Sequence, residues 1–400
     1  MESGGLIINF KFFCYTNKYI FVFLHASNFF LMIQRIDINP SMLSWAIQRA
    51  GHDVALYLQK YPEVAAWIHK EKLPTQAKLE DFAKKMHVPY GYLFLNNPPR
   101  EEIPIPMFRG SAGGGNFNVN VYDTILLLQR RQEWLSDYLT ENEYEPCHAV
   151  GVISVSTPIN KAVAVLRNLL ELDDQWVFKR RDSADAVNKL TEQIENIGIS
   201  VSFNSGVENN SRREIPVEEC RGFALVNKVV PFIFVNNRDS KTAQLFTLVH
   251  ELTHILLDAS AGFGGELDKI HDTTERYCDR VAAAFLVPAD LLNKMWQGIS
   301  KTAKTFKVSE LMIARRANEL HLISSEEYRN FYLEYQNRRF PVKKSGGSGD
   351  FYATALKRVG HLFAVHINNA VNSRHLDYLQ AYRLTGMYGN TYNTFVTKQL

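Results

Sequence analysis

The chain of 400 residues has few cysteines, little net charge and no long apolar run. Its four cysteines lie far apart and form no CxxC pair, which argues against a disulfide framework and a thiolate zinc site. The formal net charge is only +3, so no strong overall field indicates a nucleic-acid-binding protein, although a local basic patch is compatible with it. Hydrophobic residues make up 46% of the chain, enough for a sizeable core. The cysteine pattern is typical of a reducing compartment, and we expect a cytoplasmic protein.

The first 33 residues are apolar but are interrupted by polar side chains such as Lys11, Lys18 and His25. The longest stretch without a formal charge, residues 19–34, is shorter than the roughly 20 residues that a membrane-spanning helix needs. The segment also lacks the small-residue cleavage site of a secretion signal. We therefore interpret residues 1–31 as a non-native or disordered extension before a natural start at Met32, and we expect no membrane association.

Between residues 41 and 95, apolar residues recur at helical spacing in several short stretches separated by tight breaks. Short helices with tight turns are typical of a helix-turn-helix module. Its candidate recognition stretch, residues 62–70, carries Glu63, Trp67 and His69 but no arginine, whereas helices that read DNA usually present Arg, Lys, Asn or Gln to base edges. DNA binding and a role in packing or partner binding therefore both remain open for this module.

The rest of the chain alternates between helix-like and strand-like patterns. Asparagine, proline and glycine mark residues 96–118 as a linker. Residues 119–298 combine helical periodicity with strand-like alternation, which predicts helices packed on a small sheet. Residues 299–340 are predicted to form a helical subdomain, and residues 350–400 a helical C-terminal region after a second, Gly- and Ser-containing linker. The predicted fold class is α+β.

The segment His250-Glu251-Leu252-Thr253-His254 carries the most informative pattern in the chain. On a helix, two histidines four residues apart lie on one face, so both imidazoles can bind one zinc ion. Glu251 follows the first histidine and can take a proton from the attacking water. Apolar residues flank the motif on both sides, and a buried His–Glu pair in such surroundings is costly unless a metal or a partner satisfies it. The pattern predicts one catalytic Zn²⁺ ion per chain.

A catalytic zinc ion needs a third protein ligand, and His271 and Glu275 are two candidates downstream of the motif. Glu275 begins a predicted helix, and Asp279 follows one turn later on the same face, where it can orient a ligand histidine from behind. Alternatively, an acidic residue in the first turn of a helix can simply stabilise the helix through its dipole and bind no metal. Beside the zinc motif we favour Glu275 as the ligand. His271 is then a loop residue or a donor to the transition state.

Two further segments near the motif allow alternative interpretations. Residues 230–235 predict a strand in which Pro231 cannot donate to a ladder. The strand could therefore lie at a sheet edge and hold an extended peptide, or it could be an internal apolar strand. Cys278 falls on an apolar helix face and is expected to be a packed thiol rather than a zinc ligand. The basic residues between Lys301 and Arg316 could bind phosphate, although a solvated helix face is the commoner explanation.

Five segments between Arg221 and Pro288 carry a family resemblance. They are Arg221–Leu225, Pro231–Asn236, Phe246–His254, Glu275–Asp279 and Ala283–Pro288. Together they resemble the ImmA/IrrE family of metallo-endopeptidases. Outside this span, residues 41–95 look like the Xre-type helix-turn-helix often fused ahead of this protease. Residues 104–109 resemble the connector that follows it, and residues 308–316 resemble the helical segment after the zinc core.

The resemblance implies a zincin-like core, in which a small sheet accompanies the HExxH helix. It implies that His250, His254 and Glu275 bind zinc and that Glu251 is the base. Asp279 is a departure, since many members carry Asn there, and this changes hydrogen bonding around a ligand but not the ligand count. The resemblance also implies regulatory proteolysis with a helix-turn-helix repressor as the substrate.

Two functions of different class are compatible with the sequence. The first is a zinc-dependent endopeptidase that cuts a protein partner, such as a neighbouring repressor, at specific sites. The second is a DNA-binding transcription regulator or antitoxin-like protein whose zinc core is structural or inactive. The presence of all four residues expected for catalysis favours the first.

Overall fold

The computed structural model describes residues 35–99, 118–258, 267–338 and 350–400, and within the helix that begins at Leu267 it describes side chains from Thr273 onward. The expectations for residues 1–31, for most of both linkers and for the His271 side chain lie outside this part of the chain. The helix begins at Leu267, so the expectations of a loop at His271 and of a first helical turn at Glu275 are wrong. The described residues form many helices and five short strands, which confirms the predicted α+β class. None of the described helices is both long and apolar enough to cross a membrane.

The N-terminal module is all-helical, as predicted. The side chains of Asn39 and Asp53 accept backbone N–H groups from the first turns of its first two helices and so fix where they begin. Leu43, Ile47 and Leu79 are fully buried in a small core of their own. The elements are α1 (Pro40–Arg49), α2 (Val54–Lys60), α3 (Pro62–Ile68), α4 (Gln76–Met86) and the 3₁₀ helix η1 (Tyr90–Phe94).

A three-stranded sheet in the order β1-β5-β4 lies at the centre of the molecule. Strand β1 (Ser200–Asn204) runs parallel to β5 (Phe232–Asn236), and β4 (Gly222–Leu225) runs antiparallel to it. All of β5 is buried, which explains its unbroken apolar run from Phe232 to Val235. A separate two-stranded hairpin, β2 (Gly206–Val207) and β3 (Asn210–Glu214), was not expected from the sequence.

Strand β5 is internal, so the edge alternative for residues 230–235 is wrong and the internal alternative is confirmed. Pro231 precedes the first residue of the strand, where its missing N–H costs no ladder bond, and its carbonyl accepts a hydrogen bond from Ser200 N at 2.9 Å. The edge strands are therefore β1 and β4.

Of the two edges, β1 is covered by the C-terminal region. The N–H of Val201 points away from β5 and donates to the Glu195 carboxylate, while the Val201 carbonyl oxygen lies 2.9 Å from where a Cβ on Gly360 would stand. Gly360 joins α14 (Phe351–Val359) to α15 (His361–Asn372) and adopts a positive φ of 90°. Only glycine fits this close approach, so the turn between α14 and α15 closes the β1 edge.

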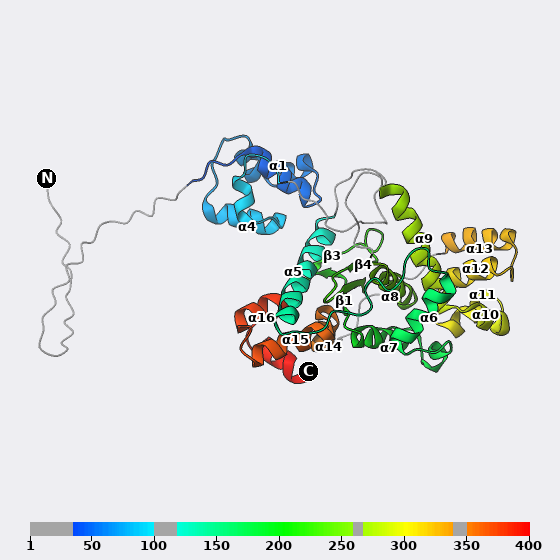
Figure 1. Cartoon of the computed structure of the whole chain (residues 1–400). Helices are drawn as coiled ribbons and strands as arrows, with labels where there is room; N and C mark the ends of the chain where they lie inside the picture. Colours follow the sequence, from blue (N-terminus) through cyan, green and yellow to red (C-terminus); the bar gives the residue numbers. More distant parts are fainter. Residues whose placement is uncertain (1–34, 100–117, 259–266, 339–349) are drawn as a thin grey trace, which may run out of the picture.

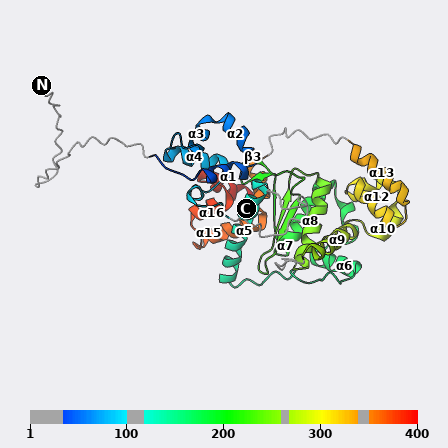
Figure 2. The same cartoon turned by 90° about the horizontal axis from the view of Figure 1, so that it is seen from above.

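Helices cover both faces of the sheet and create two cores (Figure 1, Figure 2). Successive side chains of β5 point to opposite faces of the sheet. Ile233 and Val235 therefore lie in the first core, and Phe232 and Phe234 lie in the second. The first face carries α6 (Ile159–Leu170), the 3₁₀ helix η2 (Trp176–Lys179), α7 (Ser183–Asn196), α8 (Lys241–Leu256) and α9 (Leu267–Leu286). The second face carries α5 (Val119–Glu141), α14, α15, α16 (Tyr378–Thr385) and α17 (Asn390–Gln399).

Four helices follow α9, of which the first three pack beside the first core. They are α10 (Ala289–Met295), α11 (Ile299–Phe306), α12 (Glu310–Glu319) and α13 (Ser325–Asn337). Phe306 and Ile313 are fully buried and join α11 and α12 to that core. Residues 299–306 were not expected to form a helix of their own. The position of α12 matters for function, because it faces the N-terminal half of α8 across a cavity.

Candidate metal centre

The HExxH segment lies in the second half of α8, which is the most buried helix on the first face of the sheet. Ser240 caps the helix by accepting the Ala243 N–H at 3.2 Å. Leu248 and Leu252 are fully buried in the core. This packing fixes the rotation of the helix, so that His250 and His254, each 7% exposed, turn towards α9.

Three side chains from α8 and α9 converge on one point. The Nε2 atoms of His250 and His254 lie 3.2 Å apart. Glu275 of α9 places one carboxylate oxygen 3.2 Å from His250 Nε2 and the other 2.9 Å from His254 Nε2. Donors bound tetrahedrally to zinc at the usual bond lengths stand about 3.3 Å apart. The observed spacing therefore fits a single metal ion with these three ligands.

The charges around the three donors also fit a cation. Burial alone would lower the pKa of His250, but Asp279 and Glu275 beside it raise the pKa to about 10. Burial alone would raise the pKa of Glu275, but the two imidazoles lower it to about 2. Glu275 Oε1 is buried without a well-directed hydrogen bond. Such a carboxylate oxygen is satisfied when a metal ion lies between it and the histidines.

Glu251 lies where α8 approaches the edge strand β4. A Cβ on Gly222 of β4 would stand 3.6 Å from Glu251 Cγ and only 2.4 Å from Thr247 Cγ2. The strand can therefore pass this close to the helix only with glycine at position 222. Glu251 is partly exposed, in contrast to the two buried histidines, and its charge is close enough to His250 to raise the pKa of that imidazole.

Comparison with protein-family models gives two matches. Residues 194–318 match the peptidase M78 model, described as an IrrE N-terminal-like domain. This part of the chain belongs to the ImmA/IrrE family of metallopeptidases. Residues 359–398 match DUF8813, a domain of unknown function. A search among curated proteins finds no match.

The M78 match includes all of the converging donors, but neither match reaches residues 41–95. Most candidates proposed from the sequence lie together in this M78 domain. His250, His254 and Glu275 form the cluster, and Asp279 Oδ1 lies 3.0 Å from His250 Nδ1 on the far side of the ring. Cys278 is fully buried, and burial raises the pKa of its thiol well above the usual range. It is not one of the three converging donors.

Two features of the M78 domain escaped the sequence analysis. The first is Gly222, whose only signal was a glycine inside a strand-like stretch. The second is the position of Arg315 and Arg316 on α12, where they line a cavity next to Asp279. Arg316 pairs with Glu319 at 2.9 Å. Arg315 is exposed as well as lining the cavity, whereas Arg316 is partly buried.

Proposed function

We propose that the chain is a zinc-dependent endopeptidase in which His250, His254 and Glu275 bind the metal and Glu251 is the base. The observation that carries this proposal is the convergence of two imidazoles and one carboxylate within 4.8 Å of one another. Two nitrogen donors and one oxygen donor with an open fourth position are typical of catalytic zinc. The match of residues 194–318 to a metallopeptidase family supports it.

Each side chain has a separate task in hydrolysis of a peptide bond. When bound, zinc lowers the pKa of a water molecule and polarises the scissile carbonyl. Glu251 accepts the proton of the attacking water and later delivers it to the nitrogen of the leaving amine. Asp279 stands behind His250 and holds the ring in the orientation that directs Nε2 at the metal.

The β4 edge is suited to hold the substrate backbone. Asn236 N donates to Arg221 O at 2.8 Å, and the ladder alternates from there, so Gly222 and Ala224 turn their N–H and C=O groups away from β5. An extended peptide that pairs with these groups would pass directly in front of Glu251. We therefore assign to β4 the pairing with an extended peptide that the sequence suggested for residues 230–235.

We further propose that the substrate is another protein, in particular a helix-turn-helix repressor, cut at one or a few bonds. The N-terminal module presents Leu56 at 68% exposure and Tyr61 at 38%, an apolar surface that a module of its own kind could contact. No feature of α3 favours the alternative of DNA readout, since Trp67 is buried and Glu63 pairs with Lys78 of α4.

The test is to mix the zinc-loaded protein with helix-turn-helix proteins encoded near it and to identify fragments by mass spectrometry. One defined cut that is lost with Glu251→Gln supports the proposal. Leu56→Asp should slow this cut without slowing cleavage of short peptides, because Leu56 is exposed on the N-terminal module, which has a core of its own. Indiscriminate cleavage of unfolded proteins would contradict the regulatory part, and binding of DNA without cleavage would favour the transcription regulator.

A further inference from the structure

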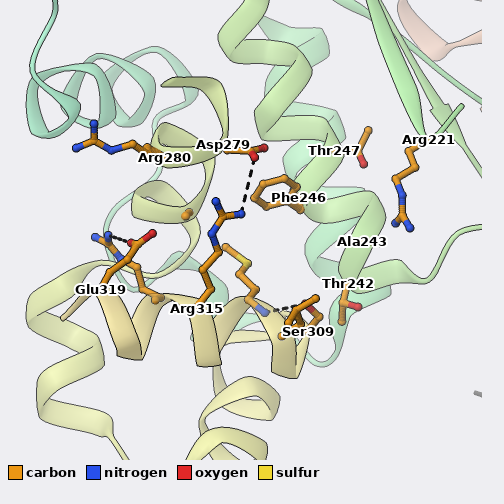
Figure 3. Close-up of a pocket in the computed structure, with 14 residues that line it drawn as sticks. Arg221, Thr242, Ala243, Phe246, Thr247, Asp279, Arg280, Ser309, Arg315 and Glu319 are labelled. Carbon is orange, nitrogen blue, oxygen red and sulfur yellow. Dashed lines mark hydrogen bonds and ion pairs between the residues drawn. The ribbon is translucent and has the colours of Figure 1, made fainter. Parts of the chain in front are cut away.

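An open cavity adjoins the metal centre on the side of His250 that faces Asp279. It occupies about 870 Å³, its open mouth included, and lies between the N-terminal half of α8, α9 and α12. The lining is mainly apolar, with Phe246 of α8 and Met312 of α12 on facing walls. Figure 3 shows Arg315 rising from α12 beside the Phe246 ring towards Asp279. The cavity therefore combines an apolar floor with a cationic side chain.

Three of the four arginines that line this cavity differ in how closely they are paired with a carboxylate. Arg221 is held by Asp239 at 2.8 Å, and Arg316 by Glu319 at 2.9 Å. Arg315 Nη1 lies 3.9 Å from the nearest oxygen of Asp279, and its side chain is 60% exposed. A guanidinium group can bind a carboxylate through two parallel hydrogen bonds. Arg315 has this capacity still available towards the cavity.

The cavity lies on the path of a peptide aligned along β4. Arg221, which precedes β4, lines the cavity, and so does Thr247, which Gly222 approaches. Thr247 stands one turn before Glu251 on α8. A substrate segment that passes in front of Glu251 along this edge would therefore place one of its side chains at the mouth of the cavity.

We propose that this cavity is a specificity subsite that takes a glutamate side chain of the substrate. Its methylene groups pack between Phe246 and Met312, and its carboxylate pairs with Arg315. This inference rests on the proposed peptidase function and names the side chain that the site selects. A substrate glutamine has the same shape and makes the apolar contact but not the ion pair. Comparing glutamate with glutamine therefore measures the contribution of the charge alone.

The first readout is cleavage of a proteome-derived peptide library by the zinc-loaded protein, with cut positions read by mass spectrometry. Glutamate should be enriched at one fixed position from the cut, and matched peptides with Glu there should exceed those with Gln by about tenfold in kcat/KM. Arg315→Gln should remove this difference while the bound zinc stays the same. Lys301→Gln, an equal charge change on the exposed face of α11, should leave the difference in place.

The second readout is binding, which needs no cleavage. N-acetyl-glutamate methylamide and its glutamine counterpart are titrated by NMR into zinc-loaded Glu251→Gln protein, with and without Arg315→Gln. Tighter binding of the glutamate probe that depends on Arg315 supports the subsite even if the wild type cuts nothing, in which case the peptidase function alone fails. Cleavage without a glutamate preference, or equal binding of both probes, overturns the subsite and leaves the peptidase function standing.

Discussion

His250 Nδ1 lies 3.0 Å from Asp279 Oδ1, while Nε2 of the same ring faces the donors of His254 and Glu275. The contact is at ion-pair distance, although its direction is not that of an ideal hydrogen bond. An imidazole held by a carboxylate at one nitrogen directs the other nitrogen in a fixed direction. Because Glu275 and Asp279 are four residues apart on α9, both face the His250 ring. Glu275 lies beside Nε2, where the metal would bind, and Asp279 lies beside Nδ1 and orients the ring.

Replacing Asp279 tests this support. Asp279→Ala should weaken zinc binding by about 10- to 100-fold, because His250 loses the group that orients it. Asp279→Asn keeps an acceptor oxygen and should lose much less. Isothermal titration of zinc into chelator-treated protein measures both, and equal affinities for the alanine variant and the wild type would show that Asp279 has no part in the centre.

The third ligand can be tested in the same assay. Glu275→Ala should lower zinc affinity far more than His271→Ala, because the Glu275 carboxylate converges with the His250 and His254 imidazoles. Circular dichroism of each variant controls for loss of the fold. The reverse order of affinities would identify His271, rather than Glu275, as the third zinc ligand.

Gly222→Ala tests whether the edge strand β4 lies as close to α8 as the structure indicates. The new Cβ would lie 2.4 Å from Thr247 Cγ2 and 2.7 Å from the Phe234 carbonyl oxygen. We expect a loss of about 1 to 3 kcal/mol in the free energy of unfolding and a marked loss of peptide cleavage. Gly91→Ala is the matched control, since its Cβ would meet no atom within 4 Å. A variant at Gly222 with wild-type stability and activity would refute the close contact.

Much of this site was predictable from sequence because it depends on local spacing. The all-helical N-terminal module agrees with the prediction, and the two histidines lie on one helix face as the motif requires. Sheet order was not predictable, since it depends on pairings between distant segments. Pro231 was compatible with an edge strand until β1 and β4 were found on either side of β5. The same holds for Arg315, which approaches Asp279 only through the packing of α12.

Glu195 predicts how stability depends on pH. Burial is the main cause that raises its pKa from 4.5 to about 7, although backbone N–H groups at Val201, His361 and Leu362 act in the opposite direction. The unfolded chain releases this proton near pH 4.5, and the folded chain keeps it until about pH 7. The folded state therefore binds more protons between these values, and the free energy of unfolding falls as pH rises through this window.

The size of this effect is about 3 kcal/mol in total. Glu195→Gln removes the titrating group, so the difference in unfolding free energy between wild type and variant should change by about this amount between pH 4.5 and pH 7. Urea unfolding of chelator-treated protein at a series of pH values measures it without a contribution from metal release. A difference that is constant with pH would show that the Glu195 carboxyl titrates normally.

The central claim is that one metal ion at His250, His254 and Glu275 works with Glu251 to hydrolyse peptide bonds. The most direct measurement follows bound zinc and peptide cleavage in the same sample while zinc is added to chelator-treated protein. We predict that cleavage rises with occupancy up to about one zinc per chain, and that Glu251→Gln binds the same zinc with cleavage reduced by a factor of about 10² to 10⁴. Cleavage that persists without zinc, or that survives Glu251→Gln at full occupancy, would contradict the account.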